Sequence, residues 1–421
     1  MSFSNLFNRP DQNYKVIDGI RAIAILWVII FHAWLFQLNT FPDTITGVFN
    51  YPFFIWITRG DLGVDLFFVI SGFLIGTILF KEFKKNSKID FKKFYLRRFF
   101  RLIPAYTFAM LLAIYFLKDI GLNNWESAWS NFLYINNYII GSYMPWTWSL
   151  AIEEQFYIFA PFLIAFILPM FRKKWLFFSI LAIIPIALTY HYSANIFQFT
   201  IPFKSTFLDD NWNNWFWNYY MLTHLRYGGL LSGVAAAYLN VYYRASVVQY
   251  FSNNDKINNL LILFCISIFI FISSVSLGQW TELETSVFDA LPTGSGRWYE
   301  ILHREVFCYG VAFLILASIY SKSMIIKPLT YFLSLDFFYP FAQVSYSAYL
   351  FHEMFMLWYF PKATIYLQAS DFSEMNIIML NGLVSLVVIL FVASLMYLII
   401  EMPFQKMRNK LTLTKADLNF K

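Results

Sequence analysis

Two ionisable side chains share one face of the first apolar segment. Arg21 and His32 are eleven residues apart, so in an α-helix they differ by three turns plus about 20° and lie about 16 Å apart along the axis. A guanidinium and a titratable imidazole are costly inside a membrane unless they line a polar cavity, so the pair indicates a functional site. Each alone also has a structural explanation, because Arg21 could extend to the membrane surface and His32 could be a hydrogen-bonded packing residue. Asp18, at the start of the segment, is a further catalytic candidate.

A second unit places two carboxylates at the start of another apolar segment. Glu153 and Glu154 follow Trp148 in the run from Pro145 to Tyr157. Adjacent helical residues point about 100° apart, so both carboxylates can hardly face one cavity. One of them could orient a catalytic histidine, or pair with an arginine in a purely structural role. Further polar groups recur in apolar surroundings, at Arg226, His303 to Glu305, and His352 with Glu353.

The stretch from Lys81 to Arg101 carries nine basic residues and two acidic ones. Attraction to anionic lipid explains most of its lysines. Attraction to lipid does not account for the arginines in the same way. Arg98 and Arg101 share a helical face just before an apolar segment, and Arg97 is adjacent to them. Planar guanidinium groups can hold a phosphate through paired hydrogen bonds.

Between Gly60 and Ile75, small residues alternate with ionisable ones. Ser71 and Gly72 form a small-residue contact of the kind that membrane helices use for close packing. Asp65, near the outer end of the segment, is harder to explain by packing.

The composition indicates what positions these residues. Of 421 residues, 59% are hydrophobic and only 13% are charged, against about 25% charged in soluble domains. Aromatic residues make up 22% of the chain, which suits wide interfacial belts. Cys265 and Cys308 lack the spacing of a disulfide framework or a metal site. We therefore predict an all-α polytopic membrane protein.

The hydropathy pattern predicts about ten transmembrane helices, since each crossing needs about 20 mostly apolar residues. Their centres lie near Val28, Ile70, Leu111, Phe159, Ala182, Gly233, Phe264, Leu314, Leu350 and Ile389. With both termini cytoplasmic, inner loops and tails hold 23 Lys and Arg residues against five in the outer loops, which supports this orientation. The net charge of +6 therefore reflects topology and gives no reason to expect a nucleic-acid partner.

The outer loops are rich in Trp and Tyr and contain Asp209, Asp210, Glu282 and Glu284. Aromatic planes beside acids could bind sugars, although an interfacial aromatic belt explains most of them equally well.

These stretches together resemble acyltransferase family 3, the bacterial membrane O-acyltransferases of surface polysaccharides such as lipopolysaccharide O-antigen. The matching motifs follow the family order from residue 18 to 404: Asp18-Gly19-x-Arg21 with His32, Gly63-Val64-x-x-Phe67-Phe68-x-x-Ser71-Gly72-Phe73, Arg97-Arg98-x-x-Arg101-x-x-Pro104, Trp148-Ser149-Leu150-x-x-Glu153-Glu154-Gln155-Phe156-Tyr157, Arg226-x-Gly228-Gly229, Tyr349-Leu350-x-His352 and Glu401-x-Pro403-Phe404. The resemblance implies a membrane domain over residues 1–404 and a basic cytoplasmic tail over 405–421. Many relatives append a soluble domain, and we expect none here.

The resemblance also implies a cytoplasmic acyl-CoA donor, acetyl-CoA by default, and a hydroxyl of a surface glycan or lipid-linked glycan as acceptor, at the inner membrane of a bacterium. Our hypothesis is that His32 acts as general base or as transient acyl carrier, oriented by Glu153 or Glu154. The donor side would comprise Arg21, Ser71, Arg97, Arg98 and Arg101, and the acceptor side Asp65, Trp148, Arg226 and His352. An extended pantetheine arm could bridge the about 16 Å between Arg21 and His32.

A secondary transporter or a lipid-linked sugar flippase is the alternative, because such proteins also hold ionisable residues at membrane depth. A donor-handling enzyme needs both the arginine cluster and the Arg21 and His32 pair, whereas a flippase needs neither. The sequence has no Gly-x-Ser-x-Gly nucleophile motif, no His-x-x-x-His zinc pair and no His-x4-Asp motif of glycerolipid acyltransferases. We expect no bound metal.

Overall fold

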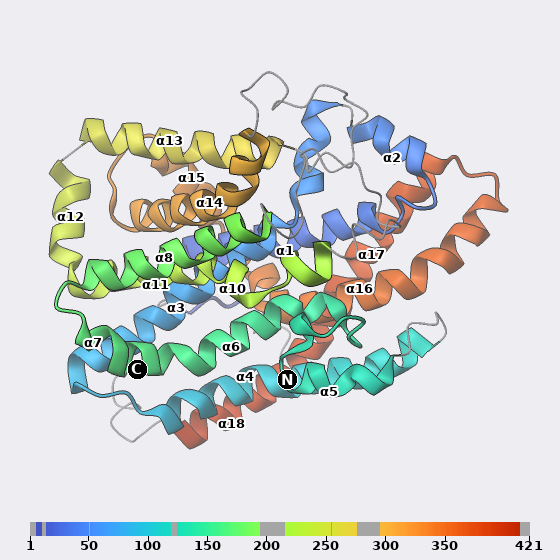
Figure 1. Ribbon diagram of the computed structural model, residues 1–421. Helices are drawn as coiled ribbons and strands as arrows, with labels where there is room; N and C mark the ends of the chain where they lie inside the picture. Colours follow the sequence, from blue (N-terminus) through green and yellow to red (C-terminus); the bar gives the residue numbers. More distant parts are fainter. Residues whose placement is uncertain are drawn as a thin grey trace.

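The computed structural model describes residues 6–10, 14–49, 51–118, 124–193, 215–253, 255–275 and 295–412, and this part of the chain contains helices and no strand (Figure 1). The longer elements are α1 (Lys15–Leu35), α2 (Pro42–Phe49), η2 (Pro52–Arg59), α3 (Leu62–Asn86), α4 (Phe91–Lys118), α5 (Ala128–Phe132), α6 (Trp148–Phe162), α8 (Lys174–His191), α11 (Gly228–Tyr242), α12 (Arg244–Asn253), α13 (Asp255–Ser274), α14 (Ser295–Tyr320), α15 (Ile326–Leu333), α16 (Tyr339–Gln368), α17 (Glu374–Met396) and α18 (Met402–Thr412). Turns of π-helix join α6 to α7 (Leu168–Met170) and α17 to α18, and α10 (Thr223–Arg226) precedes α11. The predicted all-α class is confirmed for the described residues.

Each of the ten predicted span centres lies in a helix. Within the described residues, eight helices are long and apolar enough to cross a membrane: Lys15–Leu35, Leu62–Asn86, Phe91–Lys118, Pro145–Met170, Lys174–His191, Lys256–Ser274, Trp298–Tyr320 and Glu374–Leu411. The other two centres, Gly233 and Leu350, lie in α11, which has 15 residues, and in α16, whose apolar run His352 and Glu353 interrupt. The count of ten and the cytoplasmic termini remain predictions.

Close backbone contact joins α3 to α11 near the middle of the molecule. A Cβ atom on Gly72 would overlap the carbonyl oxygen of Leu230, and one on Gly233 would overlap that of Val69. Only glycine allows this approach, so the small-residue contact expected around Ser71 and Gly72 is present. It fixes the orientation of α3, on which Ser71 and Asp65 point about 120° apart.

The helices α1 and α16 lie side by side and run in the same direction. The backbone at Gly19 meets that of Leu333, just before α16, and His32 meets His352 further along both helices. Each level along α1 therefore faces the same level along α16.

The C-terminal helix α18 lies against α4 (Figure 1). The rings of Phe100 and Phe404 stack with centroids 6.5 Å apart. The first part of the predicted basic tail, up to residue 412, is therefore packed on α4. Residues 413–421 lie outside the described residues, as do Asp209, Asp210, Glu282 and Glu284 of the predicted sugar-binding loops.

Candidate active site

The His32 side chain lies between α1 and α16 against two α16 residues. Its Nε2 atom is 3.1 Å from Oε1 of Glu353, and its Nδ1 atom is 3.2 Å from Nε2 of His352 and 2.9 Å from the carbonyl oxygen of Val28. His352 is fully buried, and its Nδ1 lies 2.6 Å from the carbonyl oxygen of Tyr349. The side chains of His32 and Glu353 are 17% and 13% exposed, so the pair borders on accessible space.

The backbone contacts assign the protons of this cluster. A carbonyl oxygen only accepts hydrogen bonds, so Nδ1 of His352 donates to Tyr349 and Nδ1 of His32 donates to Val28. The Nε2 atom of His352 is then an acceptor and receives the Nδ1 hydrogen of His32 as a second partner. One proton remains to be shared between Nε2 of His32 and Glu353. His352 and two backbone carbonyls thus orient an imidazole–carboxyl pair that can take up and release a proton.

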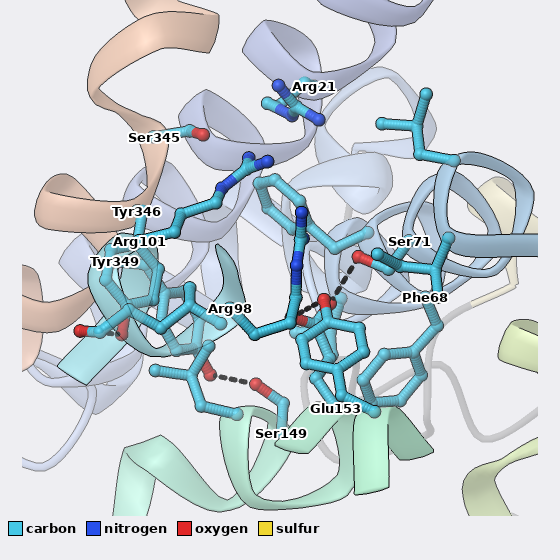
Figure 2. A pocket seen from close by; sticks show the side chains of 17 residues that line it. Arg21, Phe68, Ser71, Arg98, Arg101, Ser149, Glu153, Ser345, Tyr346 and Tyr349 are labelled. Atoms are coloured by element: carbon cyan, nitrogen blue, oxygen red, sulfur yellow. Dashed lines mark hydrogen bonds between the residues drawn. The ribbon is translucent and has the colours of Figure 1, made fainter. Parts of the chain in front are cut away.

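A narrow inner cavity of about 90 Å³ lies among α1, α3, α4, α6 and α16 (Figure 2). Its polar lining includes Arg21, Arg98 and Arg101 at one end, Ser71 and Glu153 in the middle, and Ser149 and Tyr349 at the other. Ser71 donates a 2.8 Å hydrogen bond to Glu153, and the hydroxyls of Ser149 and Tyr349 are 2.7 Å apart. The ring of Tyr349 is 5.2 Å from that of His352, so the cavity ends beside the histidines.

The inner end of this cavity carries excess positive charge. Arg21, Arg98 and Arg101 line it, while Glu153 is its one acidic lining residue. That carboxylate already accepts from Ser71 and Tyr157. The Nε atom of Arg98 is buried and has no hydrogen-bond partner among the described residues. Buried cations need a counter-charge, so this end of the cavity suits an anionic ligand.

Arg98 also lines a second, larger groove of about 580 Å³ at the same end of the molecule. The groove lies between the end of α3, the start of α4 and α18. Arg97 is part of it as well, so the structure brings the three predicted arginines to the junction of groove and cavity.

On the other side of His32 lies an outer cavity of about 290 Å³, between the end of α1 and the second half of α16. The ring of Phe36, which lines it, is 5.5 Å from the imidazole of His32. In the part of the chain that the structure describes, its lining is apolar or neutral and carries no charged residue: Phe36, Gln37, Thr40, Met356, Leu357, Phe360, Pro361, Thr364, Ile365 and Gln368. This cavity suits an uncharged ligand with hydroxyl or apolar groups.

Several predicted acceptor-side residues instead form a buried ion-pair cluster. The two carboxylate oxygens of Asp65 lie 3.1 Å from Arg226 and 2.5 Å from Arg304. Arg304 also pairs with Asp61, which in turn pairs with Arg59. Burial alone would raise the pKa of Asp61, but the guanidiniums of Arg59 and Arg304 hold this pKa well below its usual range.

The aromatic partners of this cluster include Trp148. The guanidinium of Arg226 lies over the rings of Trp148 and Tyr220, at 5.2 and 4.6 Å from their centroids. The structure thus places Asp65, Trp148 and Arg226 together around Arg304, and both oxygens of Asp65 accept hydrogen bonds from arginines.

Three further predicted residues, Glu153, Glu154 and Asp18, also lie away from His32. The carboxylate beside His32 is that of Glu353, whereas Glu153 hydrogen-bonds Ser71 and Tyr157. Glu154, as its angle on the helix requires, does not line the inner cavity. Asp18 lies about 21 Å from His32 along α1 and forms an ion pair with Arg9, so it cannot contact a group that reacts at His32.

The described residues thus combine helices long and apolar enough to cross a membrane with an imidazole–carboxyl pair that lies between two cavities. Residues 14–401 match the model of acyltransferase family 3, described as an acyltransferase domain, so the chain belongs to this family. With several described helices long and apolar enough to cross a membrane, it is a multi-pass membrane protein of this family.

Relatives support this assignment over part of the chain. A peptidoglycan O-acetyltransferase OatA of Listeria monocytogenes is 37% identical over 169 residues, 36% of this chain and 24% of that protein. An O-acetyltransferase OatA of Staphylococcus aureus is 34% identical over 190 residues, 40% of this chain and 28% of that protein. The match thus covers about a quarter of each relative's length. No solved structure matches the chain.

Proposed function

We propose that the protein is a membrane O-acetyltransferase that moves an acetyl group from cytoplasmic acetyl-CoA to a hydroxyl of an extracytoplasmic glycan. The observation that carries this proposal is the order of groups along α1 and α16. Along both segments, inner-cavity residues come first, histidines next and outer-cavity residues last: Arg21 and His32 on α1 with Phe36 directly after it, and Tyr349, His352 and Met356 on α16. The reacting pair thus lies between the two cavities, next to Tyr349 of the inner cavity and Phe36 of the outer cavity.

The inner cavity supports acyl-CoA as donor. Its three arginines can hold phosphates, and the about 16 Å of helix from Arg21 to His32 matches an extended pantetheine arm. Ser71, Ser149 and Tyr349 lie along this path and offer hydroxyls to the amides of the arm. The thioester would then lie beside His32.

The chemistry needs one proton acceptor and one proton donor, and the pair of His32 and Glu353 holds both. The acceptor hydroxyl gives its proton to the unprotonated member of the pair, and its oxygen forms a bond to the acetyl carbon. The carbon–sulfur bond breaks, and the departing thiolate takes the proton that the pair already shared. The pair ends with the proton count with which it began.

The acceptor is assigned more broadly than the lipopolysaccharide expected from the sequence. One relative is named a peptidoglycan O-acetyltransferase, so cell-wall glycan is an equal choice. The neutral outer cavity fits a sugar hydroxyl of either glycan. The bias of Lys and Arg toward one face supports a cytoplasmic, inner-membrane location with the outer cavity facing away from the cytoplasm.

The test is mass spectrometry of the surface glycan from a deletion strain, its parent and a strain complemented with the wild-type gene. We expect acetyl esters to be lost on deletion and restored on complementation. Unchanged acetylation in all three strains would contradict the proposal. Purified protein should also melt at a higher temperature with CoA, because the donor site binds its phosphates, whereas no shift at saturating CoA would favour the transporter alternative.

Filling the outer cavity should block the acceptor and spare the donor. Thr40 is exposed and lines this cavity, so Thr40→Trp adds bulk with little effect on folding. We expect transfer to glycan to fall about tenfold or more, equivalent to about 1.4 kcal/mol, while slow hydrolysis of acetyl-CoA stays within about twofold. A parallel loss of both activities would show that the cavity is not specific to the acceptor.

The same side chains also have the spacing of a metal site, since ligand atoms of His32, His352 and Glu353 lie within 4.8 Å of one another. The proton assignment leaves no need for a cation, because these atoms satisfy one another through hydrogen bonds. We predict that dialysis against EDTA leaves acetyl transfer unchanged and that mass spectrometry of the purified protein finds no stoichiometric metal. Loss of activity on dialysis, restored by zinc, would reverse this prediction.

A further inference from the structure

The basic groove beside the inner cavity is built from three separate elements. Among the described residues, its charged lining comprises six cations and one acid: Lys81, Lys85, Lys93, Arg97, Arg98, Arg408 and Glu82. The acid is already engaged, since Oε1 of Glu82 accepts the backbone N–H of Asp90 at 3.0 Å. The groove therefore presents a concentration of positive charge in one concave site.

Cations share helical faces in this groove. Lys81 and Lys85 are four residues apart on α3, and Lys93 and Arg97 are four residues apart on α4. Like charges at this spacing share one face and repel each other. An anion bound beside Lys81 and Lys85 would relieve the repulsion between them.

The last described helix brings a further cation to this site from the far end of the sequence. Arg408 lies on α18, which the stacked rings of Phe100 and Phe404 hold against α4. A general preference for basic inner loops explains the number of lysines but gives no reason for α18 to close a groove over them.

Arg98 lines both the groove and the inner cavity. A ligand that threads the cavity past Arg21, Arg98 and Arg101 would therefore continue into the groove. Acyl-CoA has two phosphate groups of this kind, a pyrophosphate at the end of the pantetheine arm and a 3′-phosphate monoester on the ribose beyond it. A phosphate monoester carries a charge of about −1.5 to −2 at neutral pH.

We propose that Lys81, Lys85, Lys93 and Arg408 form a subsite for the 3′-phosphate of the donor, and that this subsite makes the enzyme select acetyl-CoA over acetyl-dephospho-CoA. The proposal rests on the proposed function and names the part of the donor that the groove recognises. The same phosphate chemistry is offered by anionic lipid headgroups, so the experiment separates the two sources.

The experiment measures kcat/KM for acetyl transfer by the purified protein in phosphatidylcholine vesicles, once with acetyl-CoA and once with acetyl-dephospho-CoA as donor. The variants are Lys85→Gln and Arg408→Gln, and the matched control is Lys92→Gln, an exposed neighbour of Lys93 that does not line the groove. We expect wild-type protein to prefer acetyl-CoA by about tenfold or more, because a hydrogen bond to a charged group contributes that much. Each groove variant should lose this preference, and the control should keep it.

The possible results distinguish failure of the 3′-phosphate subsite from failure of the proposed function and from lipid binding. Equal use of both donors by wild type, or an equal loss for both donors in the variants, would overturn the subsite. If neither donor is used, the proposed function itself fails. If adding phosphatidylglycerol changes both donor rates in wild type and not in Lys85→Gln, the groove binds lipid phosphate instead. Lys85→Gln, distant from the α18 contact, keeps the test decisive if Arg408→Gln fails to fold.

Discussion

The variant Glu353→Gln is expected to lower the rate of acetyl transfer by about 10² to 10⁴-fold, the range for loss of general acid–base catalysis. Its carboxylate lies 3.1 Å from Nε2 of His32, and the two share one proton. Glutamine has nearly the same shape but cannot accept or release that proton. The amide can still hydrogen-bond the imidazole, so the protein should fold and bind CoA normally.

The measurement compares initial rates of transfer with thermal stabilisation by CoA. Glu374→Gln is the matched control, because Glu374 lies at the exposed start of α17 and contacts Thr44 instead of the histidines. A Glu353→Gln enzyme that retains the wild-type rate would exclude the pair as the proton-transfer unit. A similar loss of rate in Glu374→Gln would point to general damage to the outer face.

Replacing Arg304 with methionine should have the largest effect on stability. The guanidinium lies 2.5 Å from Asp65 and 2.6 Å from Asp61, and both carboxylates are buried. Removing one partner from a buried ion pair leaves uncompensated charge, at a cost of about 3–5 kcal/mol. We therefore expect a large drop in melting temperature in detergent or failure to accumulate in the membrane.

Arg172→Gln serves as control, since this arginine is exposed. Melting temperatures of the two variants within a degree or two of each other would show that the cluster contributes little. Because the pKa of Asp61 is held low in the folded protein, the ionised Asp61 stabilises the folded state at neutral pH. This stabilisation should be lost only as the pH falls below the usual range of a carboxyl group toward the folded-state pKa.

The sequence predicts best what a single helix determines. The spacing of Arg21 and His32 places both on one face of α1, and the spacing of Arg98 and Arg101 brings both to the inner cavity. The 100° between Glu153 and Glu154 indicates that only one of them faces the cavity, and Glu153 does. Helical periodicity alone supports each of these statements.

Contacts between helices that are far apart in the sequence cannot be predicted from helical periodicity. Glu353 is visible in the sequence beside His352, but nothing in the pattern places α16 parallel to α1 with these residues at the depth of His32. Asp61, Asp65 and Arg304 pair across about 240 positions of sequence. Arg408 reaches the basic groove because α18 folds back on α4, although its composition resembles that of a solvated tail.

The most direct test of the central claim is the transfer of radiolabelled acetyl from acetyl-CoA to glycan by purified protein in proteoliposomes. The acceptor is surface glycan isolated from a deletion strain, and the comparison is between wild type and His32→Ala at equal protein content. We predict labelled glycan with wild type and a rate at least about 10²-fold lower with the variant. Equal labelling by both would contradict the placement of the chemistry at His32.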